Sequence, residues 1–353
     1  MKNIILNKYA KKVTAYTGNI MILASIILFT ACSQSIEQPI TPKNKEKTPF
    51  NWSTCEVLFK EGHTHGMKFH GNPTFEGSTM PKEQYFVLKR NTNGDIYMIP
   101  GKGMDSRKYL IAIAGWKYAM RLVFKDANGK VINDKIISNG MNKHYQIFYT
   151  VSDKDSGKKK YTPIDVRTGK NLQLGNSSND ISKLTNKFYD YIYRDTNPDS
   201  VQIDDPIPGK KDTYSTLLYK TLTDNIRDYI GLKGYFTFKL FSLSDNSDED
   251  DSGLLAQYFI AMRMFYINTD KYLANSMEDP KAKCPLDYDS PFNAWKEIFR
   301  FNLPIKIIAD LSDSYPRPER YYKDLSREFG KTPDQLKEED DKATPEDNST
   351  FYM

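Results

Sequence analysis

The stretch YAMRLVFKDANGKVI, residues 118 to 132, gives the clearest indication of fold in this chain of 353 residues. Its first part, YAMRLVFK, is short and rich in aliphatic and aromatic residues, which is typical of a β-strand. Asp126-Ala127-Asn128-Gly129 follows, and an Asn-Gly step favours a tight hairpin turn because both residues tolerate positive φ. The stretch therefore predicts a strand that ends in a tight turn, as in an antiparallel sheet.

Strand-like runs of the same kind recur on both sides of this stretch, separated by turn residues. They are CEVLFK, QYFVLKR, DIYMIP, KYLIAIAG, YQIFYTV, FYDYIYRD, KGYFTFKLF, QYFIAMRMFYI and IFRFNLPIKIIA. The 24 Tyr and 19 Phe favour strands and are explained by core and cross-strand packing. The chain is therefore predicted to be mainly β, antiparallel and β-sandwich-like, with two β-rich halves and one or two helices.

The strand pattern is interrupted at residues 152–180, which are polar and rich in Gly, Lys, Ser and Asn. We interpret them as a connection between an N-terminal β-domain, residues 50–151, and a C-terminal β-rich domain, residues 181–313. Strands from both halves could also build one two-sheet sandwich. The long interruption favours two domains side by side.

Two further segments have helical or charged character. Apolar residues over 214–230 are spaced for a helix that Gly231 ends. Residues 314–353 are expected to form a charged, partly disordered tail outside the core. Within that tail, Thr332-Pro333 is typical of a helix start, with a capping residue before a proline.

The N-terminus has the features of a secretory signal. Four lysines and no acidic residue precede an apolar stretch that is shorter than the roughly 20 residues of a membrane-spanning helix and ends in small residues at Cys32. LFTAC resembles the lipobox of bacterial lipoproteins. We expect residues 1–31 to be removed, Cys32 to be acylated and residues 32–49 to form a flexible tether; the alternative is an ordinary cleavage site with a free Cys32.

Charge and cysteine content restrict the other functions. The formal charge of the whole chain is +5, and removal of the four signal-peptide lysines reduces it to about +1. A nearly neutral protein gives no support for nucleic-acid binding, which needs clustered Lys and Arg. Cys55 and Cys284 remain, and a disulfide between them is compatible with an exported protein but is not required by the sequence.

Three of the four histidines lie in GHTHGMKFHG, residues 62–71. His63 and His65 would project from one face of a strand and could bind one ion. His70 would point to the opposite face unless the chain bends, for which Gly66 is suited. His144 begins another predicted strand and could join them. The four histidines are thus a candidate site for zinc, copper or haem iron; the alternative is that they line a polar face and stabilise turns.

Two acidic features are further candidate sites. Glu61 could act as a base beside a metal bound at His63, as a hydrolase would require. The acidic run at residues 245–253 has oxygen ligands for calcium but lacks the Gly and Glu spacing of an EF-hand, so a solvated loop is favoured.

The segments EVLFKEGHTHGMKFHGNP, NKHYQIFY, FYDYIYRDTNP, IGLKGYFTF and FNLPIKI resemble a family of poorly characterised Bacteroidetes-type surface lipoproteins with a Gly-His-x-His-Gly segment. The resemblance covers about residues 55 to 308. It implies a surface or periplasmic lipoprotein and brings no activity with it.

Three functions are compatible with these features. The leading hypothesis is a lipoprotein of the cell envelope, anchored in the outer membrane through acylated Cys32, that binds a metal or haem iron through its histidines. The second is a surface protein that binds a glycan or a protein through Tyr-rich strands without a metal. The third is a metal-dependent hydrolase, although an enzyme is the less expected class and no catalytic residue is assigned.

Overall fold

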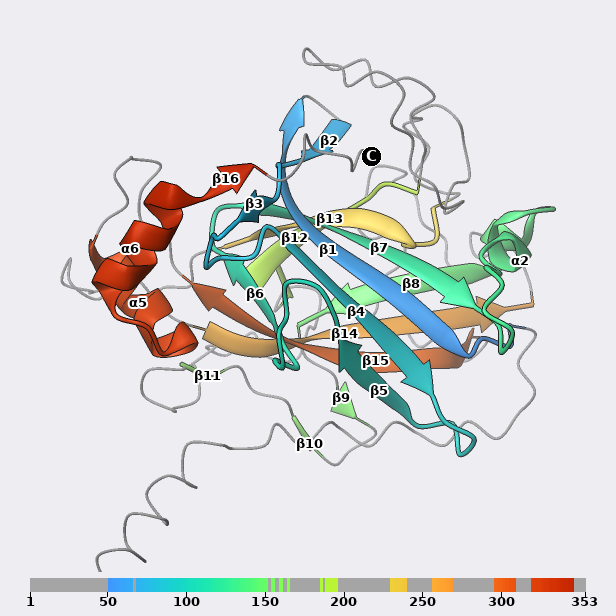
Figure 1. Cartoon of the computed structure of the whole chain (residues 1–353). Helices are drawn as coiled ribbons and strands as arrows, with labels where there is room; N and C mark the ends of the chain where they lie inside the picture. The colour runs from blue at the N-terminus through green and yellow to red at the C-terminus, as the bar shows by residue number, and fades with distance from the viewer. Residues whose placement is uncertain are drawn as a thin grey trace, which may run out of the picture. The chain divides into compact units, whose positions relative to one another are not determined.

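The computed structural model describes residues 50–65, 68–151, 154–155, 159–160, 164–165, 185–186, 188–195, 229–239, 256–268, 295–308 and 319–345. The fold is mainly β, as predicted, with few helices (Figure 1). The predicted signal peptide, Cys32 and its tether, Cys284, the acidic run 245–253 and most of the predicted helix 214–230 lie outside the described residues. None of the described helices is both long enough and apolar enough to span a bilayer.

The first sheet has seven strands in the order β12-β13-β7-β1-β4-β5, with β2 also paired to β1. Every pair in it is antiparallel. Its strands are β1 (Thr54–His65), β2 (Lys68–Gly71), β4 (Glu83–Arg90), β5 (Ile96–Pro100), β7 (Lys117–Lys125), β12 (Tyr189–Tyr193) and β13 (Lys233–Phe238).

The second sheet has five strands in the order β11-β14-β15-β6, with β8 also paired to β14. All pairs are antiparallel except β15 with β6, which run parallel. The strands are β6 (Leu110–Ile113), β8 (Tyr145–Thr150), β11 (Ile164–Asp165), β14 (Ala256–Ile267) and β15 (Trp295–Ile308). Two short ladders, β9 (Lys154–Asp155) with β10 (Lys159–Lys160) and β3 (Phe75–Glu76) with β16 (Thr344–Pro345), complete the pairing.

Each sheet takes strands from both halves of the chain, which corrects the expectation of two separate β-domains. Strands β12 and β13 extend the first sheet by pairing with β7, and β14 and β15 pair with β8 and β6. Pairing across the interruption at 152–180 satisfies backbone groups of β7 and β8 that pairing within the first half leaves open. The sandwich-like part of the prediction is therefore the part that the strand pairing supports.

The core lies between the two sheets. Along β1 the side chains alternate, and Cys55, Val57 and Phe59 point inward and are fully buried. Trp52 and Phe124, on the side of the first sheet, pack edge-to-face against Phe299 of β15, with ring centroids 5.3 and 5.8 Å apart. Offset and edge-to-face aromatic contacts of this kind join the two layers into one core.

The turn predicted after β7 is present. The amide of Gly129 donates to Asp126 O at 3.0 Å, the amide of Asp126 donates to Lys130 O at 2.9 Å, and Gly129 has φ of +79°. The returning chain adds only one bridge, between Val131 and Lys125, before the short helix α2 (Asp134–Ile137) and the 3-10 turn η1 (Met141–Lys143). The prediction of the turn is confirmed, and the return is too short to form a second strand.

Two helices, α5 (Glu319–Phe329) and α6 (Pro333–Lys342), occupy the segment expected to be a tail outside the core. Tyr321, Tyr322 and Leu325 of α5 and Leu336 of α6 are buried in a cluster with Met80, Ile111, Ile113 and Ile308. These few apolar residues, three on one face of α5 and one on α6, are hard to recognise in a segment of mostly charged residues. The helix start at Thr332 is confirmed, because Thr332 and Gln335 form a reciprocal capping box.

Strand β1 extends past its neighbours at its C-terminal end. Its pairing with β4 stops at Lys60 and its pairing with β7 stops at Gly62, whereas residues 62 to 65 pair with β2. The hairpin of β1 and β2 therefore projects from the first sheet (Figure 1).

Candidate metal centre

The projecting end of β1 carries two of the predicted histidines. Val57, Phe59, Glu61, His63 and His65 lie on one face of the strand, because side chains alternate along it. The first three are fully buried, whereas His63 is exposed and His65 is half-buried. The core-facing side of β1 thus changes from apolar to polar at Glu61 and ends in a pair of imidazoles.

Strand β2 brings His70 to the same face. In the antiparallel register His63 lies opposite His70, and Gly62 lies opposite Gly71. Directly opposed residues in an antiparallel pair project to one side of the sheet. The return of the chain therefore resolves the odd spacing that would place His70 on the other face of a continuous strand; Gly66, proposed to make the bend, lies outside the described residues.

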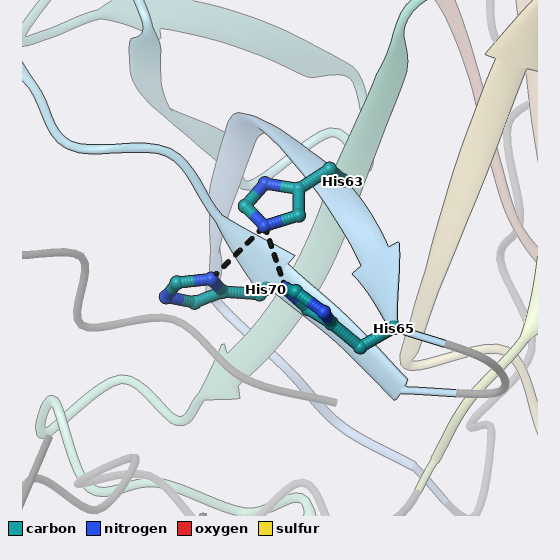
Figure 2. Close-up of side chains that lie close together, drawn as sticks. All are labelled: His63, His65 and His70. Atoms are coloured by element: carbon teal, nitrogen blue, oxygen red, sulfur yellow. Dashed lines mark hydrogen bonds between the residues drawn. The ribbon is translucent and has the colours of Figure 1, made fainter. Parts of the chain in front are cut away.

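The three rings point their nitrogens at one another (Figure 2). His63 Nε2 is 2.8 Å from His65 Nε2 and 3.3 Å from His70 Nδ1. One ligand nitrogen from each of the three residues lies within 4.8 Å of the other two. This is the group of potential metal ligands that the described part of the chain brings together.

These separations are close to those of a metal site. Two nitrogens bound to one tetrahedral ion at about 2.0–2.1 Å are about 3.3 Å apart. The His63–His70 separation of 3.3 Å already matches, and the His63–His65 separation of 2.8 Å needs a small outward rotation of two rings. His63 and His65 are solvent-accessible, so an ion can enter.

A set of residues that the sequence did not reveal lies behind His63. His63 Nδ1 is 2.7 Å from Asn72 Oδ1, and Asn72 Nδ2 donates to Glu61 Oε1 at 2.9 Å. Lys82 Nζ pairs with the same carboxylate oxygen at 2.5 Å, and Tyr118 OH donates to Glu61 Oε2 at 3.5 Å. Asn72 follows the glycine-spaced segment by one residue, and nothing in its spacing distinguishes it from an ordinary turn residue.

His144 does not join the site. It follows η1, its ring lies 6.3 Å from that of Tyr266, and the adjacent Tyr145 packs against Phe50, just ahead of β1. His63 lies near the far end of β1, and nine residues of strand from 54 to 63 span about 30 Å. The inclusion of His144 is therefore corrected: its strand, β8, belongs to the second sheet and begins at the opposite end of the sandwich.

The other predicted features are placed as follows. Glu61 is fully buried and is held by Lys82, Asn72 and Tyr118, so it supports His63 through Asn72. Most described tyrosines on strands are core residues; Tyr97 of β5, at 39% exposure, stands out as exposed. Cys55 is fully buried, which raises the pKa of its thiol.

Comparison of the chain with protein-family models, with curated proteins and with solved structures finds no match. The site therefore has to be interpreted from its own geometry.

Proposed function

We propose that this protein is a lipid-anchored protein of the outer membrane that binds a transition-metal ion through His63 Nε2, His65 Nε2 and His70 Nδ1. The observation that carries the proposal is the convergence of these three nitrogens within 4.8 Å on a projecting hairpin. Neutral imidazole nitrogens are common ligands for zinc and copper.

The geometry favours a bare ion over haem. Haem iron takes its protein ligands along the axis of the macrocycle, one on each side. Three nitrogens grouped on one face of a hairpin suit instead three adjacent coordination positions of a tetrahedral or tetragonal ion. We therefore propose zinc or copper as the ligand, with capture or storage as the role.

The membrane anchor rests on the N-terminal sequence. Apolar residues before Cys32 support export and acylation, and residues 33–49 would tether the folded part to the bilayer. A tethered protein whose imidazole cluster is open to solvent at His63 and His65 would hold metal at the surface of the envelope.

The test is metal content and titration of the purified protein with zinc and copper, beside two variants. His63→Ala/His65→Ala removes two ligands, and His144→Ala removes a histidine about 30 Å away. We expect one equivalent of metal in the parent and in His144→Ala, and none in the double variant. Equal metal content in all three proteins, or none in the parent, would overturn the proposal.

A further inference from the structure

The buried carboxylate of Glu61 and the amide of Asn72 form a chain of hydrogen bonds that reaches His63. The Glu61 carboxylate pairs with Lys82 Nζ at 2.5 Å, and a carboxylate in such an ion pair can only accept hydrogen bonds. Asn72 must therefore turn its NH₂ group toward Glu61, where Nδ2 lies 2.9 Å from Oε1.

The orientation of Asn72 determines the proton position on His63. With Nδ2 committed to Glu61, the atom 2.7 Å from His63 Nδ1 is the amide oxygen, which has no hydrogen to donate. His63 must then supply the hydrogen from Nδ1. A neutral imidazole carries one N–H, so Nε2 is left with a free lone pair directed at His65 and His70.

We propose that Glu61 and Asn72 are positioning residues that hold His63 in the Nδ1–H tautomer and so prepare its Nε2 to bind a metal. This role extends the proposed metal-binding function and rests on it, because the preparation of His63 Nε2 serves the binding of a metal. Such outer partners orient a ligating histidine and increase its basicity. Lys82 completes the arrangement, since its Nζ pairs with the same oxygen of Glu61 to which Asn72 donates.

A pair of nearly isosteric variants separates this role from general stability. In Glu61→Gln/Lys82→Met the new amide can donate as well as accept and no ammonium fixes its orientation, so Asn72 is free to flip and offer its NH₂ to His63. Glu83→Gln/Lys60→Met is the matched control: Glu83 pairs with the fully buried Lys60 of strand β1 at 3.2 Å, so this variant removes a comparable ion pair away from Asn72.

Two readouts are measured on the parent and both variants. Long-range ¹H–¹⁵N correlation spectra of the metal-free protein show which imidazole nitrogen carries the proton, and zinc competition titrations give the affinity. We expect Nδ1–H on His63 in the parent and in Glu83→Gln/Lys60→Met, and a mixture of tautomers in Glu61→Gln/Lys82→Met. Zinc affinity should fall about 10- to 100-fold in Glu61→Gln/Lys82→Met and stay unchanged in the control.

The outcomes distinguish this inference from the proposed function. An Nε2–H tautomer of His63 in the parent, or a tautomer and zinc affinity unchanged by Glu61→Gln/Lys82→Met, would overturn the positioning role. If the parent shows the Nδ1–H tautomer, Glu61→Gln/Lys82→Met relaxes it and neither protein binds metal, the hydrogen-bond chain stands and the metal-binding function falls. Loss of the tautomer in Glu83→Gln/Lys60→Met as well would show a general structural effect and overturn the specific role.

Discussion

Gly62 determines how closely strand β2 approaches β1 beside the histidines. A Cβ atom at this position would lie 2.2 Å from the carbonyl oxygen of His70 and 2.4 Å from Cζ of Phe69. A backbone oxygen cannot rotate away, so Gly62→Ala should displace β2 and with it His70. We expect the free energy of unfolding in urea to fall by about 1–3 kcal/mol, and zinc to bind more weakly by at least about tenfold, which corresponds to roughly 1.4 kcal/mol.

Gly234→Ala is the control for this prediction. A Cβ atom there would lie 2.3 Å from Tyr191 OH and 2.5 Å from the carbonyl oxygen of Ile192, a comparable clash at β13 in the same sheet. We expect a similar loss of stability and an unchanged zinc affinity of the folded protein. Equal zinc affinities for Gly62→Ala and the parent would contradict the role of Gly62.

At the scale of single residues, the sequence predicts which histidines could bind a metal better than it predicts which residues hold those histidines in place. The pairing of His63 with His65 follows from strand alternation alone. The return of His70 depends on β2 pairing with β1, which no spacing in the sequence reveals. Asn72 and Lys82 reach the site through side-chain hydrogen bonds and an ion pair, and His144 is kept away by the sheet to which β8 belongs.

At the scale of elements, α6 depends on its N-terminal cap. Thr332 Oγ1 accepts a hydrogen bond from the amide of Gln335 at 3.3 Å, and Gln335 Oε1 accepts one from the amide of Thr332 at 2.9 Å. Thr332→Ala should destabilise α6 by about 1 kcal/mol. Hydrogen exchange of the α6 amides measures this as reduced protection.

Lys337→Ala tests the same helix away from its cap. Lys337 is exposed, and alanine is at least as good a helix former, so amide protection should be unchanged. Equal protection in Thr332→Ala and the parent would show that the packing of buried Leu336, and not the cap, holds α6 in place.

Individual strands could be read from short runs of β-branched and aromatic residues, but their partners could not. Pro304 illustrates the limit: because proline has no N–H for a sheet ladder, its presence in a strand-like run predicts an edge strand or a bulge. It lies opposite Phe259 of β14, one residue before the pairing of β15 with β6 begins at Ile305. The local rule for proline therefore holds. That β6 pairs in parallel with β15 from Ile305 onward depends on the three-dimensional arrangement and could not be predicted from the run itself.

At the scale of the whole molecule, buried tyrosines should make stability sensitive to alkaline pH. Burial raises the pKa of Tyr149, Tyr191 and Tyr258 above the usual value near 10. For Tyr145, burial is the larger cause and the nearby Tyr266 the smaller one, and together they raise its pKa to about 12. Above about pH 10 the unfolded chain loses these protons while the folded chain keeps them. Stability is therefore full below pH 10 and falls as the pH rises through 12.

Urea unfolding at pH values from 9 to 12, followed together with tyrosinate absorbance, tests this expectation. Tyr258→Phe removes one buried hydroxyl and should make the decline with pH less steep. A stability that stays constant over this range, or the same decline in Tyr258→Phe, would contradict the account of the core.

The sequence predicted a mainly β fold but not how its two halves combine. Residues 152–180 look like a domain linker because they are polar, yet strands on either side of them pair within both sheets. Composition describes the local cost of ordering a segment, whereas strand pairing depends on which apolar faces need covering. The packing of the C-terminal helices against the core was missed for the same reason, since Tyr321, Tyr322 and Leu325 are outnumbered by charged neighbours.

The most direct test of the central claim is X-ray absorption spectroscopy of the zinc-loaded protein. We predict a first shell of nitrogen or oxygen ligands at about 2.0–2.1 Å with scattering from three imidazoles, reduced to two in His70→Ala. A sulfur shell at about 2.3 Å, or imidazole scattering that His70→Ala leaves unchanged, would contradict a metal centre at His63, His65 and His70.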